Sequence, residues 1–258
     1  NKNPLIIHYH DIKSLKNDVE LNDSFYKLYK AFSPGPITFV LNKKKNSKIS
    51  KSSTAKLKTV AVRIPRNQTL RRILKILKFP LAIPSANKST RVSPVTAEDV
   101  ASEFGNSLKM ILKGKRSAIG LESTVVDLTS KIKILRPGFI NQNDISRILK
   151  KRIKFSASNN KIKAPGMLKR HYSPGIPIKL NQKSSKKNQA FIVFGKKHKK
   201  AKNIFNLSIK EDINEAARNL YKTLRMIKNK KYKIIYVSKI PTHGVGLAIN
   251  DRLSRASK

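Results

Sequence analysis

The chain has 258 residues, of which 57 are Lys or Arg and 14 are Asp or Glu, so its formal net charge is +43. It contains no Cys, which excludes disulfides, thiolate catalysis and Cys-ligated zinc. Hydrophobic residues make up 39% of the sequence, enough for a core, yet no apolar run approaches the roughly 18 residues of a membrane helix.

The basic residues are spread through every segment instead of gathering in one. We therefore interpret the charge as a property of overall composition, and we expect only weak, salt-sensitive binding to double-stranded RNA or tRNA. No secretory signal is visible, so we expect a cytoplasmic protein without membrane contact. The first residue is Asn and a predicted strand follows almost at once, so we expect the gene product to begin further upstream.

The first predicted elements are a strand at residues 4–8 and an amphipathic helix at residues 22–32, which Asn22 or Asp23 would cap. His8 and His10 would share one face of the strand. With no third ligand in view, we interpret them as strand-end histidines and not as a metal pair. A turn with two prolines then leads into a strand at residues 37–41, and residues 42–56 are predicted to form a polar loop.

The next strand, at residues 59–65, places Thr59, Ala61 and Arg63 on one side and only apolar residues on the other. An arginine in the middle of a strand is unfavourable to bury unless an anion or a carboxylate meets it. Arg63 therefore indicates an anion site, and the alternative is an edge strand whose arginine lies in solvent.

Polar side chains follow a short apolar run at residues 81–83, which comes after a predicted helix at residues 69–77. We predict a buried strand there, ending at Pro84 and leading to hydroxyl and amide residues that include Ser85 and Ser93. Such residues at the carboxyl edge of an α/β sheet usually face a ligand. The alternative is a capped loop before the next helix, whose start is marked by a capping box at Thr96 and Asp99.

Three more strands are predicted, at residues 109–112, 125–128 and 132–138, before a helix at about residues 144–152. Gly120 precedes Ser123 in a stretch that predicts a tight turn, whose amides and hydroxyls could cradle a carboxylate or a phosphate. The strand at residues 132–138 carries Arg136 beside the turn that ends it.

The composition becomes polar at residues 155–163, and a Pro- and Gly-bracketed loop with His171 and Tyr172 follows. Strands at residues 190–194 and 234–237, a helix at residues 212–227 and a last helix within residues 242–253 predict a smaller α/β unit. The predicted organisation is thus a first domain at residues 1–154, a linker at residues 155–176 and a C-terminal domain at residues 177–258.

Five segments in this order, S-P-G-P-I-T-F-V-L, V-A-V-R-I-P, P-S-A-N-K-S, G-L-E-S-T-V-V-D and I-L-R-P-G-F-I, resemble the YrdC-like family. The later H-Y-S-P segment with a small α/β unit behind it is similar to the long, two-domain threonylcarbamoyl-AMP synthases. The resemblance implies an α/β fold: a YrdC-like domain with a twisted mixed sheet, followed by a smaller Rossmann-like α/β domain. It also implies synthesis of threonylcarbamoyl-AMP and pyrophosphate from L-threonine, bicarbonate or CO2, and ATP, with the product passed to the enzymes that form threonylcarbamoyladenosine in tRNA.

By this resemblance, the threonine contacts fall on His8, Arg63, Ile83 and Ser123, and the ATP contacts on Thr59, Ser85, Ser93, Arg136 and Tyr172. Arg63, Ser123 and Arg136 form the expected catalytic set, because attack of a carbamate on the α-phosphate requires positioning and charge neutralisation. Ile83 stands where the family usually has a smaller residue. No resident metal site is expected, and Mg²⁺ is expected to enter with ATP.

The family also has a Thr-x-Tyr-Gly-Leu segment and a Lys-x-Arg element before the first strand, and neither is in this sequence. In the family these two elements bind threonine and the triphosphate. Without their Lys and Arg the phosphate site loses charged hydrogen bonds, each of which contributes roughly 1.5–3 kcal/mol. We therefore expect residues 1–258 alone to have little or no synthase activity, and near-full pyrophosphate release by them would refute this expectation.

Two other functions stay open at this point. A YrdC-like protein that binds RNA or regulates without catalysis is favoured by the charge and disfavoured by the intact set Arg63, Ser123, Arg136 and Tyr172. Carbamoyl transfer, as in related hydrogenase-maturation proteins, is disfavoured because those proteins carry zinc-finger segments and this chain has no Cys.

Overall fold

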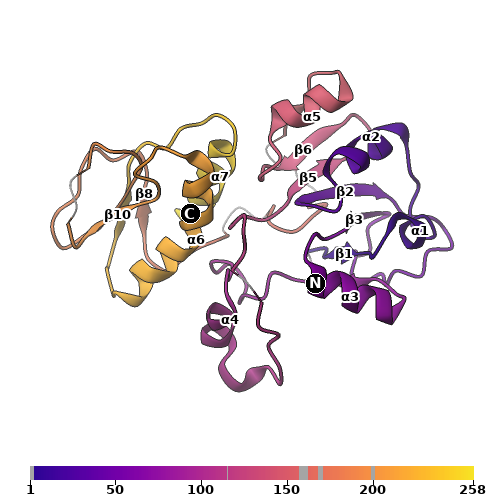
Figure 1. Cartoon of the computed structure of the whole chain (residues 1–258), viewed down its shortest axis with the longest axis horizontal. Coiled ribbons are helices and arrows are strands. Elements are labelled where there is room, and N and C mark those ends of the chain that lie inside the picture. The colour runs from indigo at the N-terminus through magenta and orange to yellow at the C-terminus, as the bar shows by residue number, and fades with distance from the viewer. Residues whose placement is uncertain (1–2, 115, 157–161, 168–170, 199–200) are drawn as a thin grey trace. The chain divides into compact units, whose positions relative to one another are not determined.

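Two β-sheets organise the chain, each in a separate unit (Figure 1). The structure is a computed structural model that describes residues 3–114, 116–156, 162–167, 171–198 and 201–258. The first unit comprises residues 1–84 and 122–168, and the second comprises residues 85–121 and 169–258. The expected domain boundaries at residues 154 and 177 stay a prediction.

The sheet of the first unit has seven strands in the order β4-β1-β3-β2-β5-β6-β7. Its strands are β1 Ile6–His8, β2 Ile37–Asn42, β3 Thr59–Arg63, β4 Leu81–Ala82, β5 Thr124–Asp127, β6 Lys133–Arg136 and β7 Lys154–Phe155. Three pairs are parallel (β1 with β3, β2 with β5, β6 with β7) and the other pairs are antiparallel. The expected twisted, mixed sheet is confirmed.

Four helices accompany this sheet: α1 Ile12–Leu15, α2 Asp23–Phe32, α3 Gln68–Leu77 and α5 Gln142–Leu149. The amide of Phe25 donates to the side chain of Asn22 (2.9 Å), which caps α2 as the sequence predicts. Helix α5 begins two residues earlier than predicted because Asn141 caps it and forms a capping box with Asp144.

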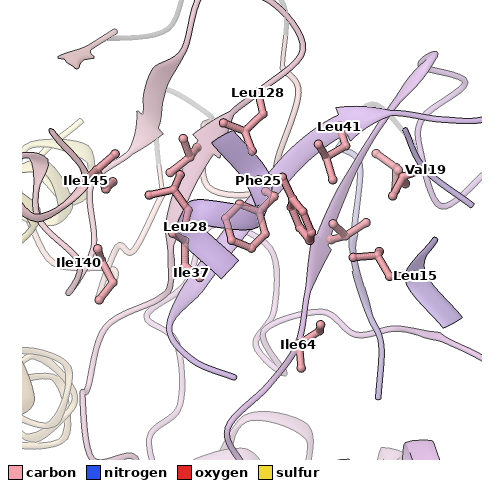
Figure 2. Close-up of a cluster of buried hydrophobic side chains, with 14 of the residues drawn as sticks. Leu15, Val19, Phe25, Leu28, Ile37, Leu41, Ile64, Leu128, Ile140 and Ile145 are labelled. Atoms are coloured by element: carbon pink, nitrogen blue, oxygen red, sulfur yellow. The ribbon is translucent and has the colours of Figure 1, made fainter. Parts of the chain in front are cut away.

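The core of the first unit lies on both faces of the sheet. On one face, Phe25 and Leu28 of α2 pack over the strands (Figure 2). The rings of Phe25 and Phe39 pack edge to face with their centroids 4.9 Å apart. On the other face, a smaller cluster contains Ile6, Val40, Ala61, Val125 and Leu135, with Ala164 and Met167 against them. Alternate residues of β3 belong to different clusters, as the period of two predicts.

Two predicted strands need correction. The apolar run at residues 81–83 predicts a buried strand, but β4 contains only two residues, is the outermost strand of the sheet and leaves Ala82 exposed. Residues 109–112 form no strand, and the side chains of Met110 and Leu112 are 74% and 58% exposed. Both errors have one cause: an apolar run shows that a strand could form but does not show whether a partner strand or a covering layer lies beside it.

The sheet of the second unit has four parallel strands in the order β10-β9-β11-β8. The strands are β8 Ile178–Lys179, β9 Ala190–Val193, β10 Ile204–Asn206 and β11 Ile235–Val237; the helices are α4 Ala97–Phe104, α6 Ile213–Asn229 and α7 Gly246–Ala256, with a 3-10 turn at Gly105–Ser107. The predicted capping box of Thr96 and Asp99 begins α4. Helix α6 corresponds to the helix predicted at residues 212–227, and its apolar side chains Ala216, Ala217, Leu220, Leu224 and Ile227 are buried. None of the described helices is both long and apolar enough to span a bilayer.

Candidate active site at one edge of the mixed sheet

Five strands of the first unit begin or end along the same side of the sheet, and this row of strand ends is called the edge of the site. His8 ends β1 and pairs with Arg63, which ends the parallel strand β3. Strands β2 and β5 begin at the same edge, where Ile37 pairs with Thr124. Because β6 runs antiparallel to β5, its last residue, Arg136, also reaches this edge. The carboxyl ends of three strands and the amino ends of two are thereby brought together.

A β-bulge sets the direction of Arg136. Val126 pairs with Ile134, so an unbroken ladder would pair Val125 with Leu135, yet Val125 pairs with Arg136. Leu135 is the extra residue, and Arg136 takes the place opposite Val125. Since residues that pair directly project to the same face, Arg136 lies on the face of the smaller core cluster. Side chains two positions apart in a strand lie on the same face, so this face also carries His8, Thr38, Arg63 and Ser123, each two positions from a member of the smaller cluster.

The guanidinium of Arg136 is buried and holds Ser123 in place. Nε donates to the carbonyl oxygen of Ser123 (3.1 Å), and Nη2 donates to the same oxygen (2.9 Å) and to Oγ of Ser123 (3.1 Å). Nη1 donates to the carbonyl oxygen of Pro165 (2.9 Å). Oγ of Ser123 also lies 2.7 Å from Oγ1 of Thr38, which is fully buried in β2. Arg136 therefore fixes both the carbonyl oxygen and the hydroxyl of Ser123, and no carboxylate among the described residues pairs with it.

Arg63 is a second cation at this edge. It is half-buried, and its Nε donates to the carbonyl oxygen of Gly35 (3.0 Å). Burial and the positive charge of Arg136 lower the pKa of Arg63 to about 10. In the described part of the chain, the two guanidiniums donate only to oxygens of Gly35, Ser123 and Pro165. Two nearby positive charges without a carboxylate between them favour the binding of an anion.

His8 is uncharged at neutral pH. Burial and the neighbouring charge of Arg63 lower its pKa to about 4, and Nδ1 lies 3.1 Å from the carbonyl oxygen of Ile6. His8 therefore adds a neutral imidazole and no further positive charge. Among the described residues, no group of three or more His, Asp or Glu side chains could hold a metal ion.

The other residues predicted for the first unit lie apart from this cluster or on its border. The amide of Ile83 donates to the carbonyl oxygen of Ile6 (3.2 Å), which places Ile83 beside β1. Thr59 lies on the same face as Arg63 but at the opposite end of β3, about 13 Å along the strand. The structure thus brings together His8, Arg63, Ser123 and Arg136, and it does not bring Thr59 to them.

Ser85, Ser93 and Tyr172 belong to the second unit. Ser85 donates to Asn87 in an exposed loop, and Ser93 is buried. Tyr172 is only 1% exposed: its ring stacks on Tyr221 of α6 with the centroids 5.8 Å apart, and the guanidinium of Arg252 lies 5.0 Å from its centroid. In this arrangement the Tyr172 ring is part of the packing of the second unit.

Sequence reasoning missed two residues of the site. Thr38 contacts Ser123, and Gly138 has no room for a side chain, because a Cβ there would lie 2.5 Å from the amide nitrogen of Thr124 and 2.8 Å from the carbonyl carbon of Ser123. Both lie within segments quoted above, S-P-G-P-I-T and L-R-P-G. The sequence therefore contains both residues in recognisable segments. Their roles depend on contacts with the distant segment around Ser123, and the sequence alone does not show these contacts.

Comparisons with known proteins cover both halves of the chain. Residues 1–138 match a family described as telomere recombination (Sua5, YciO and YrdC), and residues 140–258 match the C-terminal domain of threonylcarbamoyl-AMP synthase. The threonylcarbamoyl-AMP synthase of Pyrococcus abyssi is 33% identical in an alignment that covers 99% of this chain and 80% of the relative. The Bacillus subtilis protein of the same name is 31% identical over 99% of this chain and 79% of its own length.

A solved structure has the same fold. The crystal structure of P. abyssi Sua5 complexed with L-threonine superposes with a TM-score of 0.89 at 32% sequence identity. The superposition covers 99% of this chain and 80% of that one.

Proposed function

Since the chain belongs to the two-domain Sua5 family of threonylcarbamoyl-AMP synthases and is an enzyme of that type, we propose that its substrates are L-threonine, bicarbonate or CO2, and ATP. The products are threonylcarbamoyl-AMP and pyrophosphate. The adenylate then serves the formation of threonylcarbamoyladenosine in tRNA, through a separate transferase.

One observation carries the proposal: Arg63 and Arg136 lie close enough for their charges to interact, and neither is paired with a carboxylate in the described residues. Such a pair is unfavourable in the ligand-free protein and becomes favourable when an anion arrives. Each proposed substrate is an anion or becomes one. The relative crystallised with L-threonine, which has the same fold, supports an amino-acid carboxylate as one of these anions.

We assign the groups at the edge as follows. The half-buried guanidinium of Arg63 binds the carboxylate of threonine, with the hydroxyl of Ser123 beside it. His8 stays neutral, so its imidazole can contact the substrate without attracting a second anion. Arg136 positions Ser123 and adds positive potential for the phosphates. Ile83 borders the threonine site with its backbone.

The remaining predicted contacts concern ATP and stay proposals: Thr59, Ser85, Ser93, Arg136 and Tyr172. Mg²⁺ is proposed to arrive on the triphosphate and to neutralise part of its charge. The proposed chemistry needs no strong base on the protein. The ammonium group of threonine releases a proton to solvent, and the amine bonds to the carbon of CO2 with loss of a second proton to give a carbamate. One carbamate oxygen then forms a bond to the α-phosphorus, and the bond from that phosphorus to the bridging oxygen of pyrophosphate breaks.

The test combines binding and turnover. Calorimetric titration of the chain with L-threonine and with ATP should give saturable binding of each. Pyrophosphate release, at whatever rate it occurs, should require threonine, bicarbonate and ATP together. Mass spectrometry should identify the adenylate. Saturable binding of neither ligand would overturn the proposal, as would pyrophosphate release that continues when threonine is omitted.

A further inference from the structure

Thr38 and Ser123 form the closest side-chain contact of the site. Oγ1 of Thr38 and Oγ of Ser123 are 2.7 Å apart, and the two residues are 0% and 2% exposed. Thr38 is the second residue of β2, and Ser123 immediately precedes β5, which runs parallel to β2. The contact therefore joins two neighbouring strands at the edge where the guanidiniums lie.

The protons of this pair can be counted. Arg136 can only donate, so Oγ of Ser123 accepts one hydrogen bond from Nη2. The two hydroxyls carry one proton each, and only one of the two can be donated within the pair. Among the described residues, neither hydroxyl has another acceptor. One O–H proton is thus left over, and a buried donor without an acceptor is unfavourable.

The position of the two residues decides which proton is left. If Ser123 donated to Thr38, the remaining proton would belong to a hydroxyl that is completely buried inside β2. If Thr38 donates to Ser123, the remaining proton belongs to Ser123, which lies outside the strand at the edge of the sheet. Ser123 precedes β5 and is the slightly more exposed of the two residues, so the second arrangement presents the remaining proton at the end of the sheet where the two guanidiniums lie.

We propose that Thr38 is a positioning residue: it donates to Ser123 and thereby directs the hydroxyl proton of Ser123 toward an acceptor oxygen of the bound amino acid. This inference rests on the proposed function. Arg136 and Thr38 occupy both lone pairs of Oγ, so the Ser123 hydroxyl can act toward the substrate only as a donor. An anionic oxygen is preferred at such a position, and an ammonium group is rejected.

The alternative for Thr38 is a purely structural role, as a β-branched residue in a buried strand. Valine has the same shape and would fill the same space, so packing alone does not require the hydroxyl. Thr38→Val removes the donor and keeps the shape, whereas Thr38→Ser keeps the donor. Thr54 supplies a matched control, since it is 1% exposed in the same unit and its hydroxyl donates to the carbonyl oxygen of Lys51.

The experiment measures threonine affinity by calorimetry for the wild-type chain and for Thr38→Val, Thr38→Ser, Ser123→Ala, the double variant Thr38→Val/Ser123→Ala and Thr54→Val. We expect Thr38→Val to weaken threonine binding about three- to tenfold, the effect of losing an oriented hydrogen bond. ATP affinity should be unchanged, and Thr38→Ser and Thr54→Val should bind threonine like the wild type. In the Ser123→Ala background, Thr38→Val should have no further effect.

Three outcomes would overturn the inference. They are wild-type threonine affinity in Thr38→Val while Ser123→Ala is impaired, additive losses in the double variant, or equal losses for threonine and ATP. Circular-dichroism melting of each variant shows whether it is folded. If valine is not tolerated, Thr38→Ala removes the donor instead, and Thr38→Ser remains the variant that keeps it. A wild-type chain that binds no threonine would instead overturn the proposed function, and the inference with it.

Discussion

Replacing Arg63 with methionine should separate substrate binding from stability, because the ligand-free protein holds this charge at an energetic disadvantage. Burial and Arg136 lower the pKa of Arg63 to about 10, against 12.5 for a free guanidinium. A shift of that size corresponds to roughly 3 kcal/mol at 1.36 kcal/mol per unit. Since Arg63 is only half-buried, solvent screening reduces the disadvantage to about 1–2 kcal/mol.

Two effects then oppose each other in the free energy of unfolding of Arg63→Met. Removing the charge relieves its repulsion with Arg136, while losing the hydrogen bond to the carbonyl oxygen of Gly35 costs about 1 kcal/mol. We expect a net change within about 1 kcal/mol of zero. Threonine binding has no such compensation, because two charged hydrogen bonds at about 1.5–3 kcal/mol each are lost. That loss corresponds to a factor of about 100 or more in affinity.

Urea unfolding and calorimetric titration with L-threonine, at one pH and one ionic strength, give the two quantities. Arg72 is exposed on α3, so Arg72→Met supplies a control that removes the same charge from the surface and should leave both quantities unchanged. The reasoning is refuted if Arg63→Met binds threonine as tightly as the wild type. It is refuted equally if Arg63→Met is destabilised by several kcal/mol, which would make Arg63 a structural residue.

Three further predictions follow from single residues. The pKa of His8 is lowered to about 4, so between pH 6.5 and pH 4 the unfolded chain takes up a proton that the folded chain does not. The free energy of unfolding should therefore fall by up to roughly 3 kcal/mol as the pH drops through this range. Urea unfolding of His8→Gln should lack this part of the pH dependence. Gly138→Ala places a Cβ against the backbone of Ser123, so we expect thermal melts to show a loss of about 1–3 kcal/mol, together with weaker threonine binding. Tyr172→Ala removes a ring that packs on Tyr221, so it should destabilise the protein by about 3–5 kcal/mol, whereas Tyr172→Phe should keep most of the stability; a melt in which both Tyr172 variants behave alike would contradict this packing.

The sequence predicted the elements whose apolar residues recur with a clear period. Strand β3 alternates between the two core clusters as its residues alternate in type, and α6 buries the stripe that its spacing indicates. Caps located helix starts equally well at Asn22 and Thr96, because a cap depends on residues within one turn. These features are local, so a single sequence contains all the information that they need.

Short or exposed elements were beyond this reasoning. Strands β8 and β10 contain two and three residues, too few to show any period, and both were missed. Residues 109–112 have the apolar composition of a strand, yet the side chains of Met110 and Leu112 are exposed and no strand forms there. Whether an apolar run pairs with another strand is decided by segments far away in the sequence, and the run itself does not contain that information.

The direction of Arg136 could not be predicted from the sequence either, because it depends on how β6 pairs with β5. Strand alternation would send Leu135 and Arg136 to opposite faces, with Arg136 directed into the larger core cluster that contains Ile134. The bulge between β5 and β6 inserts one residue and turns Arg136 to the face of Ser123. A chain with identical letters and an unbroken ladder would bury a guanidinium among apolar side chains and leave Ser123 without its donor. The bulge in β6 is therefore what makes an anion site out of two separate strand ends, because it brings Arg136 opposite Val125 and onto the face of Ser123.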